Sequence, residues 1–199
     1  MQPRLNANPA SLAAMKLVDF GQLQARYQAQ SLTMRAEAVL EDAEPAMKTA
    51  ERILSMLAGH PQIEQAFASV RKNAFLTGRM RPSEAKMLLM DASGDFIEGT
   101  RHKLAAWCKT MQRLAQGEDI ARNGSNKEYI PAQAPLALAI AGSSGISNFL
   151  SVLQLSLAEL AKLDGKNAAA HAAHVAELRR CATLLADCEH ASGIHAAVQ

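Results

Sequence analysis

The side chains best suited to bind a partner are arginines and lysines in the middle third of the chain. Residues 68–116 carry nine basic and four acidic side chains, whereas residues 1–67 and 117–199 are each slightly acidic. Several cations along one edge can follow a phosphate backbone, and phosphate neutralisation dominates the affinity of nucleic-acid-binding proteins. The sequence therefore predicts a nucleic-acid-binding edge at 71–113, made by Arg71, Lys72, Arg79, Arg81, Lys86, Arg101 and Lys103.

The alternative is a solvated basic face that contacts no nucleic acid. Apart from Phe67 and Phe75, the aromatic side chains typical of single-strand binders are absent. The spacing also differs from a helix-turn-helix, whose turn has about three or four residues. An acidic protein would suit the same cations, and the Met- and Leu-rich helix faces would suit an adaptor or a homo-oligomer. DNA, RNA and acidic protein partners all remain open.

Histidines and cysteines form a second chemically capable group near the C-terminus: His171, His174, Cys181, Cys188, His190 and His195. Three of them recur every seven residues, about 10.5 Å along a helix, which is too far for one metal ion to bridge. His171 and His174 are three residues apart and would need carboxylates from other helices to complete a site. We therefore expect no metal site, with the thiols buried and the imidazoles at the surface.

No motif in the sequence predicts catalysis. The stretch Gly142-Ser143-Ser144-Gly145 has Ile146 where a nucleophile elbow needs glycine, and it lacks the lysine of a phosphate loop. We expect it to form a turn. The carboxylates show no pairing in an apolar setting. These observations predict a non-enzymatic protein with no cofactor.

The elements that position these residues are expected to be helices. The apolar residues, 49% of the chain, are mainly Ala, Leu and Met, and aromatic residues make up only 4%. Ala, Leu and Met favour helices. The chain therefore predicts an all-α fold, a single bundle of five to seven helices. A tail at 1–10 precedes a domain at 11–199, either undivided or made of two lobes, 11–116 and 136–199, joined by a long loop at 117–135.

Apolar periodicity gives the expected helix limits. The helices are predicted at 11–38, 45–58, 63–78, a short span from 83, 95–116, 147–163 and 167–191. The first should bury Phe20, Leu23, Tyr27 and Met34. The second should begin at Pro45, with Asp42 or Glu44 as its cap, and stop at Gly59-His60-Pro61, because a glycine followed by a proline ends helices.

The thirty residues from Tyr129 to Ala158 contain no charged side chain. A membrane helix needs about 20 apolar residues, but prolines and glycines interrupt this stretch. Its second half carries a one-sided leucine stripe at Leu150, Leu153, Leu157 and Leu160. We expect a buried core helix and no membrane span. Three cysteines, an odd number, and an N-terminus without a secretory pattern predict free thiols and a cytoplasmic protein.

Overall fold

The computed structural model describes residues 19–76, 92–118, 120, 132 and 146–198. Across these residues it is all-α, with seven α-helices, one 3-10 helix and no strand, which confirms the predicted helical bundle. The elements are α2 (Phe20–Gln28), α3 (Leu32–Ala58), α4 (Ile63–Leu76), α6 (Ser93–Ala115), α8 (Ile146–Leu163), η1 (Gly165–Asn167), α9 (Ala168–Ser192) and α10 (Ile194–Val198). The predicted tail at 1–10, the short helix from 83, the 142–145 turn and almost all of the 117–135 loop lie outside the described residues.

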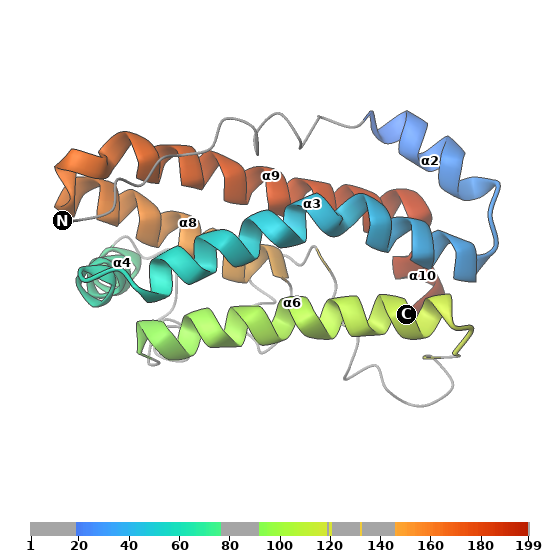
Figure 1. Cartoon of the computed structure of the whole chain (residues 1–199), viewed down its shortest axis with the longest axis horizontal. Helices are drawn as coiled ribbons and strands as arrows, with labels where there is room; N and C mark the ends of the chain where they lie inside the picture. Colours follow the sequence, from blue (N-terminus) through green and yellow to red (C-terminus); the bar gives the residue numbers. More distant parts are fainter. Residues whose placement is uncertain (1–18, 77–91, 119, 121–131, 133–145, 199) are drawn as a thin grey trace.

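Four long helices form the body of the bundle. The turn after α8 reverses the chain, so α8 and α9 form an antiparallel pair, and α3 packs against α9 and α6. Figure 1 shows α3 between α9 and α6, with α4 seen end-on because it runs across the others. Helix α4 packs against α8, and α2 packs against α9. No helix among the described residues is long and apolar enough to cross a membrane.

The predicted core faces of two helices are confirmed. In α6 the buried residues include Ile97, Leu104, Trp107, Met111 and Leu114. In α8 the whole leucine stripe is buried, at Leu150, Leu153, Leu157 and Leu160. Burial of Met111 places this methionine in the core rather than at an interaction surface. The second half of the charge-free stretch is thus a core helix.

Helix α3 is longer than its sequence signals predict. It begins at Leu32, capped by Ser31, and runs through Pro45 to Ala58, so the predicted start at Pro45 is wrong. Proline removes one backbone hydrogen bond inside a helix and usually breaks or kinks it. Here Ala43, Ala46 and Ala50 on both sides of Pro45 are fully buried. Tertiary packing of this face, which supplies most helix stability in proteins, outweighs the proline.

The first predicted helix is divided in two. The chain leaves α2 after Gln28 and starts again at Leu32, and this break turns the second segment relative to the first. Tyr27 is buried as expected, but Met34 is 54% exposed. Asp42, expected to cap a helix, instead lies inside α3 and accepts a hydrogen bond from Tyr27 Oη at 2.6 Å. This contact joins α2 to α3.

Candidate metal centre

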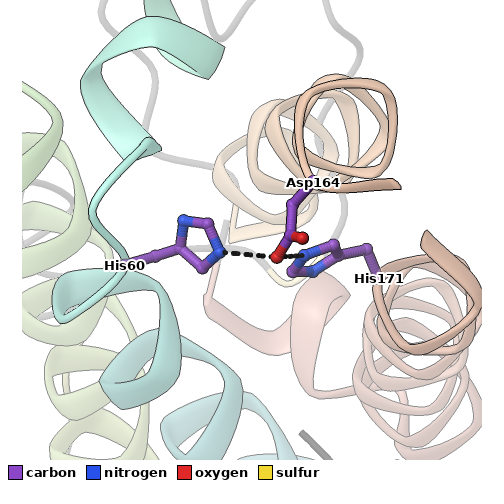
Figure 2. A group of neighbouring side chains, drawn as sticks. All are labelled: His60, Asp164 and His171. Atoms are coloured by element: carbon purple, nitrogen blue, oxygen red, sulfur yellow. Dashed lines mark ion pairs between the residues drawn. The ribbon is translucent and has the colours of Figure 1, made fainter. Parts of the chain in front are cut away.

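Three side chains meet where two inter-helix turns come together. His60 lies in the turn between α3 and α4, Asp164 directly follows α8, and His171 is in the first turn of α9. Gly59 and Pro61 end α3 around His60, and the α8–α9 reversal presents Asp164 and His171 on its inner side. Figure 2 shows the Asp164 carboxylate between the two imidazole rings. These three residues, the triad, are the group of described His, Cys, Asp and Glu side chains spaced to hold a metal ion.

The ligand atoms of the triad lie close to one another. Asp164 Oδ2 lies 3.6 Å from His60 Nε2 and 3.5 Å from His171 Nε2. The three ligand atoms all lie within 4.8 Å of one another, and the two rings meet edge-on with their centroids 5.3 Å apart. Hydrogen bonds between nitrogen and oxygen are usually about 2.9 Å long. The imidazoles therefore approach the carboxylate without forming good hydrogen bonds to it.

Burial makes His171 a neutral base beside a charged carboxylate. The His171 side chain is 0% exposed, that of His60 7% and that of Asp164 19%. Burial lowers the pKa of His171 below its usual 6.5, so the ring is neutral at pH 7 and carries a free lone pair. The hydrogen bond from Asn167 Nδ2 at 2.7 Å lowers the pKa of Asp164, helped by the nearby His171 ring. Asp164 is therefore ionised at the same pH.

His171 has no hydrogen-bond partner among the described residues. Both of its ring nitrogens are buried and unsatisfied. Buried polar atoms in folded proteins are nearly always paired, and an exception calls for an explanation such as a bound ion. A neutral imidazole offers a lone pair to a divalent metal, and Asp164 offers a charged oxygen beside it. The unpartnered nitrogens are thus an independent sign that this space is built for a ligand.

A second buried polar group, one helical turn further along α9, is largely satisfied. Arg52 Nη2 on α3 donates to Glu177 Oε2 at 2.6 Å, and Arg52 Nη1 lies 3.5 Å from His174 Nε2. Glu177 is completely buried, while the Arg52 side chain is 39% exposed. Burial lowers the pKa of His174, and the neighbouring Glu177 carboxylate partly opposes this. This ion pair crosslinks α3 and α9 beside the triad.

Glu189 forms the third buried polar group, near the other end of α9. Its Oε2 accepts hydrogen bonds from Trp107 Nε1 at 2.9 Å and from the Ala132 backbone amide at 2.8 Å. Glu189 is 1% exposed and both donors are buried with it. The carboxylate therefore holds α6 and residue 132 against α9. It has ordinary hydrogen bonds where the triad has long contacts.

The predicted basic edge is described only in part. Lys72 is exposed near the end of α4, and Lys103 on α6 lies over the Phe149 ring at 5.9 Å. Arg101 is paired with Glu51 at 2.9 Å and Glu98 at 3.1 Å, so its charge is largely neutralised. Arg71 is partly buried and has contacts within the protein. The other predicted residues, Arg79, Arg81 and Lys86, lie outside the described residues.

For the C-terminal histidines and cysteines the outcome is mixed. Cys181 and Cys188 are buried and form no disulfide, as predicted, and burial raises the pKa of each thiol to about 12. The predicted surface position of the imidazoles is wrong for His171 and His174, which are 0% and 2% exposed. His174 lies seven residues before Cys181, which places it on the same face of α9 as the two buried thiols.

Sequence reasoning missed two members of the triad and both buried glutamates. In the sequence, His60 stands out only as part of a helix stop, and Asp164 only as the residue after the predicted helix at 147–163. The sequence contained one signal for the site. His171 and His174 are close enough to share a metal ion, but they need a carboxylate from another helix to complete it. The sequence offers no indication of which distant turn supplies it.

Comparison of the chain with protein-family models, curated proteins and solved structures found no match.

Proposed function

We propose that this protein is a helical, non-enzymatic metal-binding protein, and that His60, Asp164 and His171 bind one divalent transition-metal ion. The observation that carries the proposal is the buried triad with unpartnered His171 nitrogens. Two neutral imidazoles and one carboxylate form a common ligand set for zinc and related metals.

Two of the three separations between the ligand atoms suit tetrahedral zinc. Two ligands bound to one tetrahedral zinc ion at about 2.1 Å lie about 3.4 Å apart. Adjacent ligands of an octahedral ion at that bond length lie about 3.0 Å apart. The nitrogen–oxygen separations of 3.6 and 3.5 Å are closer to the tetrahedral value. A water molecule or another residue would complete the four ligands.

Burial supports binding rather than catalysis. Both imidazoles are at least nine-tenths buried, so a substrate would reach the ion past Asp164, whose side chain is 19% exposed. The ion would link the α3–α4 turn to the α8–α9 turn. Because these turns are distant in the sequence, such a link stabilises the folded chain over the unfolded one.

The proposal is tested by isothermal titration of the full chain with Zn²⁺. We expect one ion per chain, and at least about tenfold weaker binding in Asp164→Asn and His171→Leu. His102→Gln is the matched control, because His102 is an exposed imidazole on α6 that is not part of the triad. Equal binding by all four proteins would place the zinc elsewhere and refute the proposed site.

A second proposal is that the basic segment 71–113 binds nucleic acid or another acidic partner. Its support is the excess of basic over acidic residues and the exposure of Lys72. Pairing of Arg101 with two glutamates weakens it. A salt-sensitive affinity for DNA or RNA that falls in the double variant Arg79→Ala, Arg81→Ala would support it. The charge-matched control is Lys48→Ala, Lys166→Ala, and equal losses in both would remove the segment as a specific site.

A further inference from the structure

The His60 ring has a fixed proton arrangement. The Gln62 backbone amide donates a hydrogen bond to His60 Nδ1 at 3.2 Å. A backbone amide can only donate, so Nδ1 must be the nitrogen with the lone pair. In the neutral ring the proton then lies on Nε2, which faces Asp164 Oδ2 at 3.6 Å. The nitrogen that points into the triad is thus the protonated one.

The same hydrogen bond closes the turn that leads into α4. His60 O accepts from the Ile63 amide at 3.2 Å, and Gln62 O accepts from the Ala66 amide at 3.0 Å, so Gln62 is the residue that directly precedes the helix. The His60 side chain holds this residue through its amide, in the way that a capping side chain accepts a bond from an amide two residues later.

A metal ion needs the opposite arrangement of the ring. To bind through Nε2, His60 must carry its proton on Nδ1, which it reaches by exchange with water without net proton release from the neutral ring. The Nδ1 proton would then face the Gln62 amide proton, and two donors cannot form a hydrogen bond. Histidine ligands usually donate their second ring nitrogen to an acceptor. Here that nitrogen faces a donor instead.

We infer that the metal ion and the N-terminus of helix α4 compete for His60. Zinc binding at the triad switches the His60 tautomer, releases the Gln62 amide and loosens the turn that leads into α4. This inference rests on the proposed metal site and describes its regulation. Helix α4 packs against α8 and carries Lys72 near its other end. Zinc binding therefore changes the start of α4, the helix that carries the first residues of the basic segment.

Nuclear magnetic resonance of the full-length protein tests the inference in two steps. Without zinc, the His60 ring nitrogens should show the proton on Nε2. With one equivalent of Zn²⁺ the proton should be on Nδ1, and hydrogen exchange of the Gln62 amide should become roughly fivefold faster. The Met34 amide, bonded to Ser31 Oγ at the start of α3, is the internal control and should not change.

Two substitutions at one position separate capping from metal binding. Asn is a favoured cap but a poor zinc ligand, so His60→Asn should keep slow Gln62 exchange with or without zinc. His60→Ala should show fast exchange in both conditions, because it lacks the cap and the ligand. Both variants should bind zinc at least about tenfold more weakly than the native chain.

The outcomes distinguish this inference from the metal site itself. A zinc-free ring protonated on Nδ1, or bound zinc with unchanged Gln62 exchange, overturns the competition and leaves the metal site standing. Native zinc affinity in His60→Asn also overturns it. An absence of zinc binding by the native chain overturns the metal site and the competition with it.

Discussion

The buried polar groups at the two ends of α9 differ in how well their hydrogen bonds are satisfied. Near its C-terminal end, Glu189 accepts two hydrogen bonds of ordinary length, from Trp107 and the Ala132 amide. In its first turn, His171 lies among the long contacts of the triad and has two unsatisfied ring nitrogens. Buried groups that are satisfied by the chain need no ligand, whereas unsatisfied ones leave free energy to be gained by binding. The contrast separates Glu189, which joins helices, from the triad, which we propose as the metal site.

The largest loss of stability should come from removing the carboxylate of Glu189, whose hydrogen bonds are satisfied within the chain. Glu189→Leu leaves the Trp107 indole and the Ala132 amide buried without an acceptor, and we expect a loss of about 3 kcal/mol in the free energy of unfolding. Urea unfolding measures this loss. Glu189→Gln keeps an oxygen acceptor and should lose only about 1 kcal/mol. Equal losses in the two variants would mean that the hydrogen bonds are not the cause.

The second-largest effect should be the stabilisation by zinc, which depends on the triad and not on Glu189. At a free zinc concentration about 100 times Kd, the native chain should gain about 2.7 kcal/mol of stability. Glu189→Gln should gain as much, since its triad is intact, whereas Asp164→Asn should gain little. Thermal unfolding with and without Zn²⁺ gives the comparison. A stabilisation that survives in Asp164→Asn would contradict the proposed site.

Acid should destabilise the folded chain through the buried histidines at the triad end of α9. Burial lowers the pKa of His171 and His174 below 6.5, so below pH 6.5 the unfolded chain takes up these protons before the folded chain does. Stability is therefore kept above about pH 6.5 and lost as the pH falls through the lower pKa values of the folded state. The lowered pKa of Asp164 adds a further loss below pH 3.8.

Urea unfolding in EDTA at pH 7.5 and 5.5 measures the histidine part of this loss. His171→Leu should show a smaller difference between the two pH values than the native chain. A native pH dependence in His171→Leu would assign the loss to other groups.

The smallest effect should come from His171→Leu at pH 7.5 without metal. The ring has no hydrogen bond to lose among the described residues, and leucine has a similar volume, so stability should stay within about 1 kcal/mol of the native value or rise. The matched substitution Glu189→Leu provides the contrast by urea unfolding. A loss near 3 kcal/mol in both would show that His171 is as well satisfied as Glu189.

Local sequence signals predicted much of the helical framework. The leucine stripe of α8 and the inward face of α6 followed from periodicity, because a helix repeats every 3.6 residues whatever surrounds it. The same signals failed at Pro45, where buried alanines keep α3 continuous. They also failed at Met34, because the break after α2 changes which face is inward. Both failures come from packing between helices, which a local pattern does not contain.

The sequence by itself determined that the chain is helical, that Cys181 and Cys188 are buried, and that its positive charge is gathered in one segment. Tertiary structure alone decided the triad. His60 and Asp164 lie in turns of separate helix pairs, and they meet because α3 and α4 pack against α9 and α8. Apolar periodicity predicts which face of each helix is buried, but it does not predict which distant turn that helix will contact. The candidate metal site is therefore a consequence of how the helices are arranged.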